Sequence, residues 1–146
     1  MAQRAAITSR RNVSSGGPWE ARGGYSRVVF VGDSAWVAGT TDAGDDGRSQ
    51  HPGDIAAQAR AVFEIIRGAL EQGGFSLADV VRTRMFVTDI TRSAEVIAVH
   101  EELFGAIRPA ASMVQVVALI DPSLLIEIEA DARRQAVARR QAGARR

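Results

Sequence analysis

The chain has 146 residues, of which 46% are hydrophobic and 24% charged, a composition typical of a globular protein with one buried core. A formal net charge of +1 argues against a dedicated nucleic-acid binder, and the absence of cysteine excludes disulfides, thiolate catalysis and cysteine-ligated metal. No apolar run approaches the ~18 residues that a membrane span needs, and the absence of lysine excludes Schiff-base catalysis. We therefore expect a cytoplasmic protein that does not contact membranes.

The N-terminal segment, residues 1–24, is rich in Arg, Ser and Gly and has no acidic residue before Glu20. A transit peptide can have this composition, but no amphipathic helix is evident, and the apolar stretch of a signal peptide is missing. We therefore expect a flexible terminus over residues 1–12, followed by a single domain over residues 13–132.

Two strands are predicted next, over residues 25–30 and 35–41, because apolar and β-branched residues flank a short Gly-Asp turn. The polar loop 42–54 resembles the start of a calcium-binding loop. However, Gly44 and Gly53 stand at two of the ligand positions, so we interpret the segment as a solvated turn.

The second half of the domain alternates helices and strands. A helix is predicted over residues 55–72, where apolar residues recur at helical spacing and a pair of glycines ends the pattern. A strand over 79–90, a second helix over 93–104 and strands over 112–119 and 124–132 follow. This order predicts an α+β fold. Two helices cover only one face of a five-stranded sheet, so the other face needs a further cover, usually another subunit.

The last predicted strand carries acidic residues on one face. Its alternation separates that face from an apolar one, and the residues on the polar side are Leu125, Glu127, Glu129 and Asp131. Arg82 and Arg84 share a face of the strand 79–90, and neighbouring strands would set these opposite charges across from each other. The polar face is then either solvated or a partly enclosed charged layer that leaves a carboxylate for catalysis.

His100 lies on the apolar stripe of the second helix, where a histidine is either buried with a satisfied ring or part of a polar site. His51 is the only other histidine and cysteine is absent, so we expect no metal site. The sequence contains no nucleophile elbow and no glycine-rich loop of the kind that binds phosphate.

The C-terminal tail, residues 133–146, repeats pairs of arginine at a six-residue period: RRQAVA, RRQAGA, RR. This period spreads the arginines around a helix rather than along one side of it. A flexible, solvated extension is the simpler interpretation, and weak electrostatic contact with RNA or an acidic partner is the alternative.

Residues 108–112 read RPAAS, in which two alanines precede a strand and leave space beside it. This segment resembles the RidA (YjgF/YER057c/UK114) family, as do GGYSRVVFVGDSAWVAGTT, AAQARAVFEIIRGALEQGGFSLADVVRTRMFVTDI and LLIEIEADA, over residues 13–132. The resemblance implies a chorismate-mutase-like α+β fold with a mixed sheet and two helices on one face. It also implies a homotrimer whose sheets form a central barrel, with pockets at the subunit interfaces.

The resemblance implies an activity as well. Well-studied family members hydrolyse reactive imines and enamines without a cofactor, using an arginine that binds the substrate carboxylate and a glutamate that positions or activates water. The glutamate corresponds to Glu127 and a pocket tyrosine to Tyr25, and these are the predicted catalytic residues. Gly39, followed by Thr40, corresponds to the glycine after the pocket serine.

Other pocket positions depart from the family pattern. The arginine position holds Ala111, and the pocket serine, a helix asparagine and a small residue are replaced by Ala38, Ile97 and Met113. The pocket has therefore lost its carboxylate clamp, because alanine cannot make a bidentate arginine contact. Arg108 is close in sequence, but on a regular strand it would point to the opposite face. These positions, with His100, Gly39 and Thr40, are the predicted substrate-binding residues.

Three functions stay open at this point. The first is an enzyme acting on imines, enamines or related small molecules, with Glu127 as general acid or base, Tyr25 and His100 as polar partners, and weak activity on 2-imino acids. The second is a non-catalytic trimeric protein that binds a metabolite. The third, an endoribonuclease, rests on a label often given to this family and on the arginine-rich tail alone.

Overall fold

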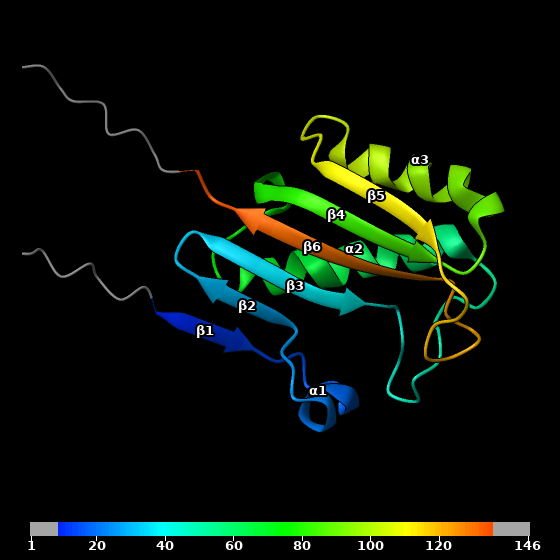
Figure 1. The fold of residues 1–146 in the computed structure, drawn as a ribbon, viewed down its shortest axis with the longest axis horizontal. Coiled ribbons are helices and arrows are strands. Elements are labelled where there is room, and N and C mark those ends of the chain that lie inside the picture. Colours follow the sequence, from blue (N-terminus) through cyan, green and yellow to red (C-terminus); the bar gives the residue numbers. More distant parts are fainter. Residues whose placement is uncertain (1–8, 136–146) are drawn as a thin grey trace, which may run out of the picture.

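A mixed β-sheet organises the part of the chain that the computed structural model describes, residues 9–135 (Figure 1). Within these residues the sheet has six strands, in the order β1-β2-β3-β6-β4-β5. The strands are β1 (Arg10–Val13), β2 (Val28–Val31), β3 (Ser34–Thr40), β4 (Val80–Val87), β5 (Ala110–Gln115) and β6 (Ile126–Arg133). Neighbouring strands are antiparallel except β4 and β5, which run parallel.

Two long helices, α2 (Ile55–Glu71) and α3 (Ser93–Phe104), lie on the same face of the sheet (Figure 1). The short helix α1 (Pro18–Gly23) lies beyond the end of β1, and the 3-10 turns η1 (Leu77–Asp79) and η2 (Ile90–Arg92) flank β4. No helix within residues 9–135 is long and apolar enough to cross a membrane. The predicted α+β architecture, a mixed sheet with its two main helices on one face, is confirmed.

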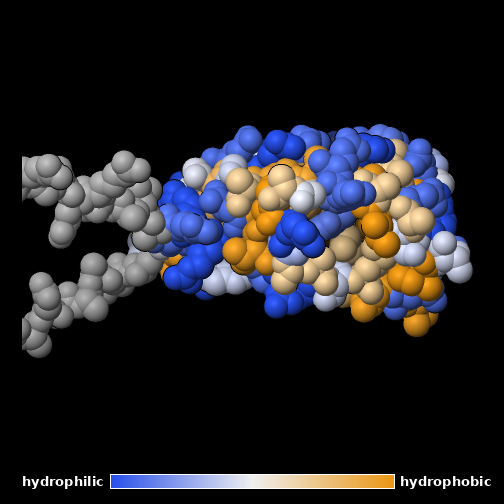
Figure 2. Space-filling model, turned by 90° about the horizontal axis from the view of Figure 1, so that it is seen from above, coloured by the Kyte–Doolittle hydropathy of each residue, from blue (hydrophilic) through white to orange (hydrophobic). Residues whose placement is uncertain are grey.

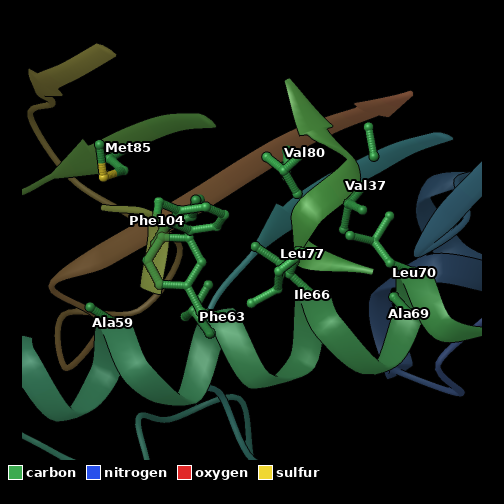
Figure 3. Packing of buried hydrophobic residues seen from close by; sticks show 14 of the residues in the cluster. Val37, Ala59, Phe63, Ile66, Ala69, Leu70, Leu77, Val80, Met85 and Phe104 are labelled. Carbon is green, nitrogen blue, oxygen red and sulfur yellow. The ribbon is translucent and has the colours of Figure 1, made fainter. Parts of the chain in front are cut away.

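Helix α2 forms one wall of the hydrophobic core. Its fully buried apolar residues are those of the predicted stripe: Ile55, Ala59, Val62, Phe63, Ile66 and Leu70. Figure 3 shows Phe63 and Ile66 pointing from α2 towards the strands, and the ring of Phe63 packs against that of Phe104 with 5.2 Å between centroids. The helix begins after Asp54, whose carboxylate accepts a hydrogen bond from the Ala57 amide at 2.9 Å.

A buried glutamine joins α2 to two loops. Gln58 donates hydrogen bonds to the carbonyls of His51 and Ser123, at 3.1 and 3.0 Å, and accepts one from the Leu125 amide at 2.8 Å. All three partners are backbone groups that would otherwise need another partner inside the protein. Gln58 therefore fixes the entry into β6 relative to the helix layer.

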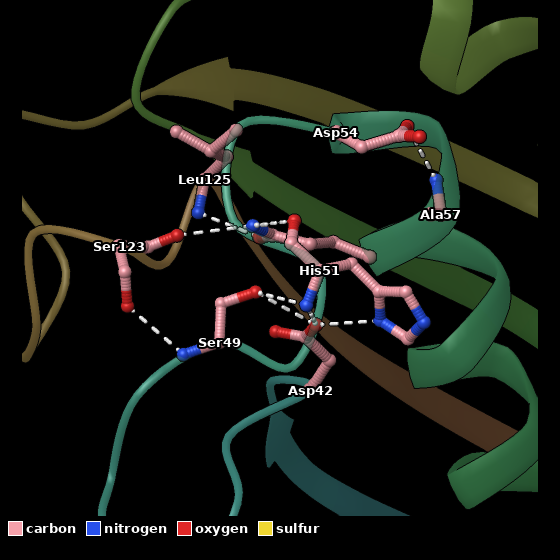
Figure 4. Close-up of polar contacts among 8 residues, drawn as sticks. Asp42, Ser49, His51, Asp54, Ala57, Ser123 and Leu125 are labelled. Atoms are coloured by element: carbon pink, nitrogen blue, oxygen red, sulfur yellow. Dashed lines mark hydrogen bonds and ion pairs between the residues drawn. The ribbon is translucent and has the colours of Figure 1, made fainter.

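The loop before α2 is anchored by a buried acid, Asp42 (Figure 4). Its Oδ2 accepts hydrogen bonds from Ser49 Oγ at 2.8 Å and from the His51 amide at 3.1 Å, and His51 Nδ1 lies 3.0 Å away. The segment interpreted from sequence as a solvated turn is thus partly buried. It belongs to the same polar cluster as Gln58.

Two elements were not predicted from the sequence, β1 and α1. Residues 10–12, expected to be part of a flexible terminus, pair with β2 as an edge strand. A segment reading RRNV has one apolar residue, so it carries no strand periodicity of its own. Helix α1 begins with Pro18 and ends before Gly24, which adopts a left-handed conformation at φ 67°.

The C-terminal boundary also differs from the expectation. Strand β6 continues through Arg133, and the guanidinium of Arg134 lies over the Phe75 ring at 4.4 Å and pairs with Asp33 at 3.6 Å. The first residues of the expected tail therefore contact the domain. The remainder of the expected tail, residues 136–146, lies outside the described residues, so its flexibility stays a prediction.

Apolar side chains reach the surface on the side of α3 and β5 (Figure 2). On these two elements Ile97 and Val114 are each about half exposed, at 56% and 48%. Strand β5 has no neighbour on its outer side within the described residues. This side of the molecule therefore combines an open strand edge with exposed apolar residues.

Candidate functional site

Glu127 lies at the centre of a cleft of about 630 Å³ between α1, the end of β3 and β6, which we call the Glu127 cleft. Residues that line it include Trp19, Arg22, Tyr25, Arg27, Gly39 and Glu127. The alternation of β6 places Glu127 on the face away from the helices, because Ile126 and Ile128 on either side are fully buried in the core. The predicted catalytic pair, Glu127 and Tyr25, thus lines one cleft.

The carboxyl group of Glu127 rests against Gly39. A Cβ on Gly39 would overlap Glu127 Oε1 and lie only 3.0 Å from Glu127 Cδ, so only glycine leaves room for the acid here. Burial raises the pKa of Glu127 above its ordinary value, Glu129 raises it further, and Arg27 partly offsets both. A partly desolvated carboxyl group of this kind is suited to proton transfer near neutral pH.

Arg27 is the cation that faces this acid, and the sequence did not single it out. Its Nη1 donates to the Gly39 carbonyl at 2.9 Å and to Thr40 Oγ1 at 2.8 Å. Thr40 Oγ1 in turn donates to the Ala38 carbonyl at 2.7 Å. The predicted pocket residues Gly39 and Thr40 therefore hold the arginine through a backbone carbonyl and a hydroxyl.

A second acid, Glu20, is buried behind Arg27 with 3% of its surface exposed. It accepts hydrogen bonds from the Ser14 hydroxyl and from the Ser15 hydroxyl and amide. Burial by itself would raise the pKa of Glu20, but these bonds, and then the charge of Arg27, hold it below its ordinary value. Its signal in the sequence was its place as the first acid after a long basic and polar stretch.

Ala38 lines a neighbouring groove of about 450 Å³ rather than the Glu127 cleft. Tyr25 borders both, and Trp36, Arg84, Glu129 and Asp131 complete much of the groove. In it Arg84 Nη1 lies 3.3 Å from Asp131 and 3.6 Å from Glu129. The predicted juxtaposition of the arginines of β4 with Glu127 and Glu129 is confirmed for Glu129, which pairs in register with Arg84. Arg82 pairs with Asp131, and Glu127 pairs with Phe86 instead of an arginine.

The remaining predicted residues gather in a second, mainly apolar cleft of about 370 Å³, which we call the Ala111 cleft. Its lining includes Met85, Ser93, Ile97, His100, Ala111 and Met113. His100 Nε2 lies 2.9 Å from the hydroxyl of buried Thr83, and its ring packs on Phe104 at 4.8 Å between centroids. Burial lowers the pKa of His100, which keeps the imidazole neutral near pH 7.

Arg108 does not line either cleft. It lies in the turn before β5, exposed, with a left-handed backbone at φ 55° and its amide bonded to the Phe104 carbonyl at 2.7 Å. The idea that its guanidinium replaces the missing arginine at Ala111 therefore gains no support from the structure.

Glu127 and Ala111 lie on opposite faces of the sheet. Ala111 pairs with Thr83, whose buried side chain contacts His100 of α3, whereas Glu127 pairs with Phe86 on the face without helices. One chain therefore cannot bring the two clefts together around a ligand. A second copy that places its β5 side against the open face of the first could do so.

No group of three or more histidine, cysteine or acidic residues that could hold a metal ion occurs within residues 9–135. The polar groups that line the Glu127 cleft instead include the carboxyl of Glu127, the partly buried guanidinium of Arg27, the exposed Arg22 and the phenol of Tyr25. This set can bind a small polar molecule and transfer a proton to or from it.

The fold is that of a single α+β domain with a mixed sheet, and comparison with known proteins identifies the family to which it belongs. The family model described as Endoribonuclease L-PSP matches residues 18–134. The chain belongs to this family, which is also called the RidA or YjgF/YER057c/UK114 family.

Individual relatives agree with this assignment. A RutC family protein of Pyrococcus abyssi is 35% identical over 77% of this chain and 88% of its own length. An uncharacterized protein of Streptomyces coelicolor is 35% identical over 87% of this chain and 94% of its own. Rv2704 of Mycobacterium tuberculosis, a solved member of the YjgF/YER057c/UK114 family, is 55% identical with a TM-score of 0.78, covering 86% of this chain and 99% of that one.

Proposed function

We propose that this protein is a cytoplasmic, cofactor-independent enzyme that acts on reactive imines, enamines or related small metabolites by hydrolysis or proton transfer. The observation that carries the proposal is the isolated, partly buried Glu127, whose raised pKa and position against Gly39 fit a general acid or base. Membership of the RidA family supports a small-molecule ligand for this protein.

The pocket in this proposal belongs to two chains. The Glu127 cleft of one subunit and the Ala111 cleft of the next form a single site in a homotrimer. Support comes from the opposite placement of the two clefts, and from an open sheet face that carries Trp36, 47% exposed, beside the charged groove. An exposed tryptophan is a residue type that interfaces between chains favour.

Hydrolysis of an imine would proceed in two stages. Glu127, as carboxylate, takes a proton from water while the water oxygen bonds to the carbon of the protonated imine, which gives a neutral carbinolamine. The protonated Glu127 then gives this proton to the amino group, the C–N bond breaks to release ammonia, and the C=O bond forms as the ammonia takes up the hydroxyl proton to leave as ammonium. Tyr25 and the neutral imidazole of His100 are the polar groups that orient the substrate within the combined pocket.

Ala111 is expected to limit the hydrolysis of imines that carry a carboxylate group. Among residues 9–135 no cation lines the Ala111 cleft, so a 2-imino acid held by its carboxylate at this wall gains no ionic contact from them. We expect weak hydrolysis of 2-iminopropionate for that reason. Ala111→Arg should raise it only modestly, because Ala38 and Ile97 still supply no hydrogen-bonding side chain.

The test is the variant Glu127→Gln, which keeps the shape of the side chain and removes its proton transfer. The substrates are 2-imino acids, generated in situ by an amino-acid oxidase, and imines without a carboxylate, generated by an amine oxidase, and ammonia release is measured. The enzyme should lose turnover in Glu127→Gln by a factor on the order of 10² to 10⁴ while it keeps ligand binding. If neither the wild type nor the variant turns over any imine, yet both bind ligand, the alternative of a non-catalytic metabolite-binding protein holds.

A further inference from the structure

The guanidinium of Arg27 is only partly used by the protein. The side chain is 14% exposed, and within residues 9–135 all its hydrogen bonds come from Nη1, to Gly39 and Thr40. Its Nε is buried without a hydrogen-bond partner, and Nη2 makes no hydrogen bond to the described residues. Arginine carries five N–H donors, and a buried cation is normally paired on more than one of its nitrogens.

Glu20 does not complete the pairing. Its nearest oxygen lies 3.6 Å from Arg27 Nε, beyond hydrogen-bond distance, and both oxygens already accept from Ser14 and Ser15. The acid is thus hydrogen-bonded by neutral donors and faces only the buried Nε of the arginine, which leaves Nη2 free. Its charge still lowers the free-energy penalty of holding the guanidinium at a buried position.

Gly39 fixes the guanidinium beside the catalytic acid. Its carbonyl accepts from Arg27, and its missing side chain lets the Glu127 carboxyl lie against its Cα. A ligand in the Glu127 cleft therefore lies near both the cation of Arg27 and the partly buried carboxyl group of Glu127, because both groups lie against Gly39. Arg22, exposed on α1, lines the same cleft and adds a second positive charge.

We propose that Arg27 binds the oxyanion of a small substrate, a carboxylate or phosphate group, through the free N–H donors of Nη2 in the Glu127 cleft. This inference rests on the proposed function, since it assigns the charge of the substrate for that same site. The substrate is then held by its anionic group from the Glu127 side of the combined pocket rather than from the Ala111 side. Weak hydrolysis of 2-iminopropionate is still expected, because its carboxylate would lie at the other side of the pocket from the position that the family arginine occupies. Planar N–H donors of this kind match an oxyanion in geometry as well as in charge.

The experiment measures binding, not turnover. Pyruvate and inorganic phosphate are titrated into the full-length protein by calorimetry, and methyl pyruvate, which lacks the negative charge, is the matched neutral probe. Wild type should bind pyruvate or phosphate, and Arg27→Gln should weaken that binding about tenfold or more while leaving methyl pyruvate unaffected. Arg60→Gln is the control variant, because Arg60 pairs with Glu102 on the helix surface and lines neither cleft.

Each outcome decides the matter. Binding of phosphate alone supports the inference and identifies a phosphate-bearing substrate, whereas binding of pyruvate alone identifies a carboxylate. Oxyanion binding that survives Arg27→Gln, equal binding of methyl pyruvate, or no binding by the wild type overturns it. If Arg27→Gln does not fold, a crystal structure of the wild type soaked in pyruvate replaces it, and a carboxylate found away from Arg27 overturns the proposal.

The two proposals fail in different ways. If oxyanion binding depends on Arg27 but the protein hydrolyses no imine, the oxyanion site stands and the proposed enzyme function is wrong. Turnover that depends on Glu127 without any dependence on Arg27 would do the opposite.

Discussion

A single residue without a side chain, Gly39, connects the two charged groups of the site. Its carbonyl holds Arg27 in place, and the space at its Cα is filled by the carboxyl group of Glu127. Position 39 therefore affects both the position of the acid and the position of the cation, although glycine itself has no chemistry to contribute.

Replacing Gly39 with alanine should displace Glu127. The new Cβ would overlap Glu127 Oε1, so the side chain must turn away from the cleft. Turnover should fall by about 10² or more, close to the effect of Glu127→Gln, because a misplaced general base is nearly as ineffective as a missing one. The measurement is kcat for each variant, and a Gly39→Ala enzyme with wild-type kcat would show that Glu127 does not act from its observed position.

Glu127 should also make the stability of the protein depend on pH. Its pKa in the folded protein lies above the ordinary 4.5, chiefly because of burial. Between these two values the folded state binds more protons than the unfolded state, so the free energy of unfolding falls as pH rises through that window. Glu127→Gln removes this loss of stability, because glutamine does not titrate. The melting temperature of the variant should therefore exceed that of the wild type at about pH 7 but not at about pH 4. A difference that is the same at both pH values would contradict the pKa shift.

At the residue scale, the sequence predicted Glu127 better than its surroundings. The alternation of acids with apolar residues in β6 identified the polar face. The pairing of acids on this face with Arg82 and Arg84 followed from the expectation that the two strands are neighbours. Arg27 and Glu20 were missed because their partners are backbone carbonyls and hydroxyls brought close only by the chain's path. Such contacts leave no periodic pattern.

At the scale of elements, α2 is the most strongly specified part of the fold. Its apolar stripe, its Asp54 cap and the glycines after it agree with one another, and the helix was predicted to within one residue. Strand β5 was placed less well, over 112–119 instead of Ala110–Gln115, because the apolar run after Gln115 leaves the sheet. Val117, inside that run, is fully exposed.

Gln58 should be important for the attachment of α2 to the sheet. Replacing it with alanine leaves the carbonyls of His51 and Ser123 and the Leu125 amide without their partner inside the protein. The expected loss is about 3 kcal/mol or more of unfolding free energy, since three buried groups lose a hydrogen bond and each costs about 1–3 kcal/mol. Urea denaturation measures it, with Gln72→Ala at the exposed end of the helix as control. A loss under about 1 kcal/mol would mean that water replaces the amide.

At the scale of the whole molecule, one face of the sheet is covered by helices and the other carries charge and an exposed tryptophan. The charged residues of β4 and β6 are already paired with each other, and Trp36 lies beside them in the same groove. This face suits contact with another chain better than contact with water alone.

We expect a homotrimer in solution. Light scattering at micromolar concentration should give three times the 15.6 kDa mass of the chain. Trp36→Glu places a further negative charge beside Glu129 and Asp131 and should shift the protein towards monomer. The far-UV circular dichroism spectrum should stay unchanged, because the fold of each chain is retained. A stable wild-type monomer would overturn both the trimer and the two-chain pocket.

The placement of Glu127 and Ala111 on opposite faces has a genetic consequence. If each working pocket takes its acidic half from one chain and its apolar half from another, two different inactive variants can rescue each other. Glu127→Gln damages only one half, and Ala111→Trp, which fills the other cleft, damages only the second. Co-expressed and randomly mixed, they should recover about a quarter of wild-type turnover, because that share of interfaces joins two undamaged halves. Purified separately and assayed alone, each would stay inactive.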